Sequence, residues 1–183
     1  ILRTAPAPLL KLSKLARDAG FRVVLTGEGA DEVFAGYTTF TAAQVRRFWA
    51  RNPSSQWRPA LLDRLYPWLV QDLGRAPQFT RQFFGAGLND VDDVLYSHHI
   101  RFATTSRALR LLNAQTRASA MGDEAPIERL RRQLPAHLEK STGLGRAQYV
   151  EIATFLSGYL LHSQGDRMLM GNSVEGRFPF LDH

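Results

Sequence analysis

Hydrophobic residues recur at helical spacing near the start of the chain and then give way to one short apolar run. Leucines and alanines at positions 9, 10, 12, 15 and 16 predict a helix over residues 8–19. Gly20 follows at the place where a left-handed residue often ends a helix. The β-branched, apolar run at residues 21–26 predicts a strand. A helix, strand, glycine turn and helix in this order are typical of the edge of an open α/β sheet, whose ligands bind beyond the carboxyl ends of the strands.

The rest of the chain predicts helices with interruptions. From residue 38 to about residue 161 the pattern is helical, and prolines mark where helices begin, end or bend. Residues 21–26 form the only convincing strand, and a single strand cannot satisfy its backbone hydrogen bonds by packing against helices. We therefore expect residues 21–26 to pair with a strand from missing parts of the same protein, or with a second copy in a homodimer.

Composition limits the class of protein. With 183 residues, 44% of them hydrophobic and 22% charged, the chain is typical of one globular domain. The absence of cysteine excludes a disulfide scaffold, a thiolate zinc site and a cysteine nucleophile within this chain. No apolar run approaches the roughly 20 residues that span a bilayer, so we expect a cytosolic protein without a membrane partner. The start at Ile1 and the abrupt end at His183 indicate a fragment.

Positive charge is distributed rather than concentrated. The chain carries 23 lysines and arginines against 17 acidic residues, a formal charge of +6. Arginines occur singly and in pairs with acids between them, whereas a nucleic-acid surface usually gathers its charge on one face. We expect solvated helix faces and ion pairs, and no nucleic-acid partner. A non-enzymatic, arginine-rich helical binding module remains an alternative.

The turn after the predicted strand combines glycines with carboxylates. Gly27 and Gly29 allow a ligand to approach the backbone closely, and the N–H groups of such a turn attract anions. Glu28, Asp31 and Glu32 would repel a bare phosphate, but a phosphate that carries Mg²⁺ would be accepted, because a hard cation binds carboxylate and phosphate oxygens together. Asp31 as a helix N-cap and Glu28 as a solvated turn residue form the alternative interpretation.

A second polar cluster lies near the end of the chain, within residues 162–182. Acids and arginines alternate there with large apolar residues, as in the pairs Asp166 with Arg167 and Glu175 with Arg177. This alternation predicts semi-buried ion pairs within a packed turn. A purely structural role for these pairs is an alternative to a role in a binding site.

The two clusters together resemble a known family. Residues 24–37 read VLTGEGADEVFAGY, and residues 166–168 and 173–182 read DRM and SVEGRFPFLD. In this order they resemble the synthetase domain of glutamine-hydrolysing asparagine synthetases, over nearly the whole chain. The resemblance implies a mainly α-helical fragment of an α/β adenine nucleotide α-hydrolase-like (PP-loop ATPase) domain, with one parallel-sheet strand near residues 21–26.

The resemblance also implies a two-step reaction and roles within it. ATP adenylates the side-chain carboxylate of aspartate, and ammonia derived from glutamine then displaces AMP to give asparagine. Thr26, Gly27 and Gly29 would form the ATP-binding turn. Asp31 would hold Mg²⁺ on the pyrophosphate, and Glu28 would be the base or charge partner for the incoming ammonia.

Other parts of the family pattern are missing from the chain. The Ser-Gly-Gly-Asp-Ser nucleotide loop, a second metal-binding aspartate, the glutaminase cysteine and a lysine beyond the final motif are not found. We expect one wall of a synthetase site, inactive by itself, in which Asp166, Glu175 and Arg177 shape that wall. A related adenylating ligase, of the β-lactam-forming or lasso-peptide-cyclising type, is an alternative that could place a different residue at Glu28.

Overall fold

The two ends of the chain fold together, and its middle forms a separate unit. The computed structural model describes residues 4–67, 77–122 and 124–182. The first unit combines Ile1–Tyr37 with Gln148–His183, and the second is Thr38–Ala147. No helix among the described residues is long and apolar enough to cross a membrane.

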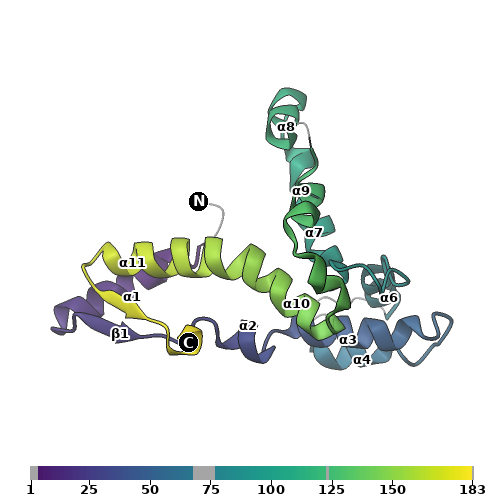
Figure 1. Cartoon of the computed structure of the whole chain (residues 1–183), viewed down its shortest axis with the longest axis horizontal. Coiled ribbons are helices and arrows are strands. Elements are labelled where there is room, and N and C mark those ends of the chain that lie inside the picture. The colour runs from purple at the N-terminus through teal and green to yellow at the C-terminus, as the bar shows by residue number, and fades with distance from the viewer. Residues whose placement is uncertain (1–3, 68–76, 123, 183) are drawn as a thin grey trace. The chain divides into compact units, whose positions relative to one another are not determined.

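The first unit begins with helix α1, Pro6–Asp18 (Figure 1). A proline in its first turn suits a helix start, and the helix continues through the leucine-rich segment. Gly20 has a φ of 90°, and its N–H donates to the Arg17 carbonyl at 3.0 Å. The predicted helix and its left-handed glycine end are therefore confirmed.

Strand β1, Val23–Leu25, lies within the predicted residues 21–26 and pairs with a second strand of the same chain, β2, Glu175–Arg177. The two strands run parallel, and Figure 1 shows β1 beside the yellow strand near the C-terminus. The Thr26 N–H extends the ladder by donating to the Arg177 carbonyl at 2.9 Å. The paired residues are Val23 with Glu175, Val24 with Gly176 and Leu25 with Arg177.

The expectation of a single strand was wrong. A Glu-Gly-Arg segment has weak strand propensity, and three residues are too few for an alternating pattern to emerge. Because β1 finds its partner within the chain, the reason for expecting a homodimer through residues 21–26 no longer holds.

A long helical segment returns the chain to the sheet. α10, Gly143–Glu151, continues as the π-helix η4, Ile152–Asp166, and then as α11, Arg167–Met170. Within η4, the side chains of Leu156 and Leu160 are buried. α1 packs against η4 and α11 (Figure 1), and the Ser13 hydroxyl donates to the Met168 carbonyl at 2.6 Å. This packing holds β2 at the side of β1.

Two further elements of the first unit lie close to the sheet. Helix α2 spans Ala30–Phe34 and follows β1 after a four-residue turn. The short 3₁₀ segment η5, Pro179–Leu181, follows β2. α2 and η5 contact one another, with the Phe34 and Phe180 rings packed edge to face. Both elements that leave the sheet at this end therefore meet.

The second unit is helical throughout its described elements. Its core is formed by buried side chains that include Trp49, Leu62 and Phe84. The elements in chain order are α3 Thr38–Ala50, α4 Ala60–Leu65, α6 Pro77–Gly85, η1 Tyr96–His98, α7 His99–Ser106, η2 Arg107–Leu111, α8 Ala114–Met121, α9 Pro126–Gln133 and η3 Ala136–Lys140.

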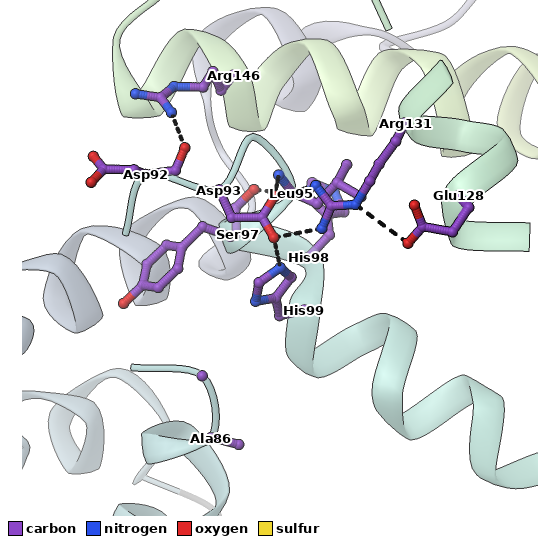
Figure 2. A network of polar contacts seen from close by, with 12 residues as sticks. Ala86, Asp92, Asp93, Leu95, Ser97, His98, His99, Glu128, Arg131 and Arg146 are labelled. Atoms are coloured by element: carbon purple, nitrogen blue, oxygen red, sulfur yellow. Dashed lines mark hydrogen bonds and ion pairs between the residues drawn. The ribbon is translucent and has the colours of Figure 1, made fainter. Parts of the chain in front are cut away.

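Arginines stabilise the second unit from within. Arg46 is 1% exposed and donates to the carbonyls of Phe84 and Tyr96 at 2.9 and 3.1 Å. Asp93 accepts two hydrogen bonds from Arg131, at 2.7 and 2.6 Å, and a third contact from His99 Nε2 at 2.7 Å (Figure 2). Because these arginines link segments that are distant in the sequence, we assign them a role in stabilising the fold of the second unit.

Candidate functional site

The candidate site begins where β1 ends. The Thr26 backbone continues the ladder, and its hydroxyl oxygen is buried without a hydrogen-bond partner among the described residues. A buried hydroxyl that lacks a partner is costly unless a ligand or water satisfies it. Beside it, a Cβ placed on Gly27 would meet no atom within 4 Å. The exit of β1 therefore offers a polar atom next to open space, as a ligand-binding turn requires.

Glu28 is partly buried and lies close to other carboxylates. Burial raises the pKa of the Glu28 carboxyl, and the negative charges of Glu32 and Asp31 raise that pKa further. The turn therefore brings the three predicted carboxylates into one electrostatic environment. Such a cluster becomes more favourable when a cation binds beside it.

Asp31 is exposed in the first turn of α2. The interpretation of Asp31 as the N-cap is wrong, because Gly29 occupies the N-cap with a φ of 91° and provides no side-chain cap. A Cβ on Gly29 would overlap the Leu181 side chain, so both the backbone conformation and the packing require glycine. The Asp31 carboxylate therefore does not cap the helix and is available for other interactions.

Glu32 differs from the other two carboxylates in its burial. Its side chain is 1% exposed, and its Oε1 accepts a hydrogen bond from the Tyr37 hydroxyl at 2.9 Å. Its Oε2 is buried without a partner among the residues the structure describes. Burial, the hydrogen bond to Glu32 and nearby negative charge raise the pKa of the Tyr37 hydroxyl. Glu32 is therefore a buried residue that helps to hold the turn in place, and its carboxylate does not face solvent.

Gln148 is the part of this arrangement that sequence reasoning missed. Its side-chain amide donates to the backbone carbonyls of Val33 and Glu32, at 2.7 and 3.3 Å. It belongs to α10, more than a hundred residues further along the chain, and no local pattern singles it out. Tyr37 was part of the recognised motif, but its hydrogen bond to Glu32 was not predicted.

The second predicted cluster lies on β2 and at the end of η4. The Arg177 Nε donates to Glu175 Oε1 at 2.8 Å, but the two side chains are 63% and 57% exposed. The expectation of a semi-buried pair is therefore wrong for Glu175 and Arg177, whose side chains leave the same side of a short strand. Asp166 is exposed as well. The segment that carries this cluster reaches the turn in two ways. Glu175 and Arg177 pair with β1, and Leu181 lies against Gly29.

The available donors suit a magnesium-bound phosphate. Glu28 and Asp31 offer carboxylate oxygens, the ligands that Mg²⁺ prefers. No group of three or more potential metal ligands occurs among the described histidines and acids. Mg²⁺ commonly needs only one or two carboxylates, because water and phosphate oxygens complete its octahedron. The residues present therefore fit Mg²⁺ that arrives with a nucleotide, and they do not form a closed metal site.

Comparison with known proteins identifies the family of the chain. The family described as "Asparagine synthase" matches residues 1–183. The chain is 30% identical over 185 residues to a Penicillium rubens protein named "Amidase chyE", and 26% identical over 196 residues to "Amidase chry2" of Gibberella zeae. It is also 29% identical over 188 residues to a "Putative asparagine synthetase [glutamine-hydrolyzing]" of Mycobacterium bovis.

These similarities cover nearly all of the chain but a small part of each relative. The alignments include 95%, 95% and 97% of the chain and 26%, 26% and 25% of the respective relatives. The chain therefore spans about a quarter of the length of these curated proteins. No solved structure matches the chain significantly.

Proposed function

Because the chain belongs to the asparagine synthase family, we propose that it forms one wall of a site that adenylates the aspartate side chain and transfers ammonia to it. The products would be asparagine, AMP and pyrophosphate. The family implies an adenine nucleotide α-hydrolase-like fold, and the parallel pair β1 and β2 is consistent with it. The observation that carries the proposal is the turn from Thr26 to Asp31, which places a buried hydroxyl and clustered carboxylates at the exit of β1.

Each residue of the turn has a distinct task in this proposal. ATP supplies the adenylyl group, and Mg²⁺ neutralises the pyrophosphate when both are bound. The Thr26 hydroxyl would donate to the nucleotide and so gain the partner it lacks among the described residues. Gly27 would keep a side chain away from the phosphates, and Gly29 would maintain the left-handed backbone of the ATP-binding turn. Asp31 would hold Mg²⁺ through its exposed carboxylate.

Glu28 is the residue we propose for proton transfer. Ammonia forms a bond to the activated carboxyl carbon while AMP departs with the bonding electron pair, and the nitrogen must lose a proton. The raised pKa of Glu28 brings its carboxyl nearer to neutral pH, where a general base is more effective. Asp166, Glu175 and Arg177 would shape the wall beside this step without touching the reacting atoms.

A second candidate function differs only in the carboxylate that is activated. Two fungal relatives bear the name amidase, which refers to an amide without naming asparagine, and this favours a different carboxylate. Such a ligase would amidate or cyclise another carboxylic acid with the same nucleotide turn. Comparing aspartate with other carboxylic acids as substrates of the full-length protein would separate the two candidates.

The test is pyrophosphate release from ATP by the full-length protein that contains this chain. We expect release to depend on a carboxylate substrate and on Mg²⁺, with aspartate as the best substrate. Asp31→Asn should reduce this rate by at least about 100-fold, and Glu28→Gln should reduce the rate of asparagine formation from ammonia by a similar factor. Glu139→Gln, at an exposed position in the second unit, should change neither rate. The isolated chain should show no turnover. Full activity of Glu28→Gln would refute the role of Glu28, and clear turnover by the isolated chain would refute the assignment of one wall.

A further inference from the structure

Helix α2 carries Asp31 but has little intrinsic stability. It contains five residues, and no side chain caps its N-terminus. At its C-terminus, Ala35 has a φ of 58°, a left-handed conformation that a residue other than glycine seldom adopts. A single turn of this kind does not persist by itself. The orientation of Asp31 must therefore be fixed by residues outside the helix.

Three contacts fix the backbone at the end of α2. The Gly36 N–H donates to the Asp31 carbonyl at 2.9 Å. The Tyr37 hydroxyl holds the Glu32 side chain, and Gln148 holds the carbonyl of Val33. Together they place Gly36 directly beside the Asp31 side chain.

The space beside Gly36 is occupied by the Asp31 carboxylate. A Cβ on Gly36 would overlap Asp31 Oδ1, and it would lie 3.1 Å from Asp31 Cγ. Gly36 has no positive φ, so its backbone would accept alanine without strain. The absence of a side chain at this position thus serves the placement of one carboxylate, whereas the glycine at position 29 is also required by its φ of 91°.

We propose that Gly36 is a positioning residue for Asp31, leaving room for the rotamer in which the Asp31 carboxylate meets a nucleotide-bound cation. The proposal rests on the proposed function of Asp31. A methyl group at position 36 would push the carboxylate out of this position while leaving the fold intact. The atom it overlaps is the end of the Asp31 side chain, and the nearest backbone atom, Asp31 Cα, lies at an ordinary contact distance of 3.4 Å.

The test measures metal binding and stability in parallel. The full-length protein is titrated with Mn²⁺ in the presence of ATP, and free Mn²⁺ is followed by electron paramagnetic resonance. We expect Gly36→Ala to weaken Mn²⁺ binding about 10-fold, the lower end of the effect seen when the groups that orient a metal ligand are disturbed. The urea midpoint should stay the same or rise, since alanine restricts the unfolded chain. Saturating Mn²⁺ should restore most of the rate of pyrophosphate release.

A matched control and a double variant make the result specific. Gly158→Ala lies on η4, where a Cβ would meet nothing within 4 Å, so its Mn²⁺ affinity should equal that of the wild type. In an Asp31→Asn background, Gly36→Ala should cause no further loss, because both changes act on one interaction. Unchanged Mn²⁺ affinity in Gly36→Ala, or an additive loss in the double variant, would overturn the proposal. Wild-type protein that binds no Mn²⁺ with ATP would instead overturn the proposed function of Asp31, and the positioning role with it.

Discussion

Glu28 illustrates the conflict between binding chemistry and stability at the scale of one residue. Its pKa is raised by burial and by neighbouring carboxylates. A group whose pKa is higher in the folded state favours folding while it is protonated, and this contribution is lost as the pH rises through the folded pKa. At neutral pH the ionised Glu28 therefore destabilises the chain until a cation compensates for it.

Removing the negative charge of Glu28 should stabilise the folded chain at neutral pH. Glu28→Gln should increase the free energy of unfolding at pH 7 by about 0.5 kcal/mol, a small amount because a partly exposed charge is screened by solvent. The gain should shrink as the pH falls toward the ordinary value of 4.5, where the wild-type carboxyl becomes protonated. Urea unfolding at several pH values measures both effects. The exposed Glu139→Gln should show no such gain, and a destabilised Glu28→Gln variant would contradict the argument.

Tyr37 gives a second prediction at the same scale. Tyr37→Phe removes the hydrogen bond to the buried Glu32 and leaves both oxygens of that carboxylate unsatisfied. We expect a loss of about 1–3 kcal/mol in the free energy of unfolding at pH 7. The exposed Tyr149→Phe is the control and should change little.

The pH dependence of Tyr37→Phe checks the cause. Because the pKa of Tyr37 is raised in the folded state, its contribution to stability is complete below the unfolded value of 10.0 and is lost as the pH rises beyond it. The gap between wild type and variant should therefore narrow above pH 10.0. A gap that widens there would show that Tyr37 ionises more easily in the folded protein.

At the scale of elements, a helix or strand could be predicted from the sequence only where its hydrophobic pattern was long enough. Helix α1 repeats its apolar spacing over 13 residues, so its pattern is clear in the sequence. β2 has three residues, two of them charged, and its pairing with β1 depends on a return path of about 150 residues. The turn at residues 26–32 was recognised because its chemistry is local. The contact of Gln148 with α2 was not, because it depends on the fold.

Gly176 provides a prediction for the sheet. It lies opposite Val24, and a Cβ there would overlap Leu169 Cδ1 of α11. We expect Gly176→Ala to lower the free energy of unfolding by about 1 kcal/mol, because overpacking displaces Leu169. Hydrogen exchange at the Thr26 N–H, which donates to Arg177, should accelerate. In a Leu169→Ala background the same substitution should cost less, and an equal cost in both backgrounds would show that α11 is not the obstacle.

At the scale of the whole molecule, the formal charge of +6 poses the question of a nucleic-acid partner. Several arginines are already engaged: Arg46 and Arg47 donate to backbone carbonyls, Arg131 binds Asp93, and Arg132 binds Glu124 (Figure 2 shows the Asp93 pair). Arginines engaged in this way cannot all bind phosphates without breaking the second unit. The formal charge of +6 therefore does not measure how many arginines are available to bind a polyanion.

The salt dependence of nucleic-acid binding measures how many of these cations are available to phosphates. A protein that neutralises six to ten phosphates loses about 10³–10⁵ in affinity between 50 and 200 mM salt. For this chain we expect any DNA or RNA binding at low salt to be weak and to fall by less than about 100-fold over that interval, because its cations are spread along the sequence with acids between them. Fluorescence anisotropy with single- and double-stranded oligonucleotides across that range measures the slope. A steep salt dependence would favour the arginine-rich binding module. Mn²⁺ binding that requires both ATP and Asp31 would favour the synthetase site, even if the protein also binds polyanions weakly.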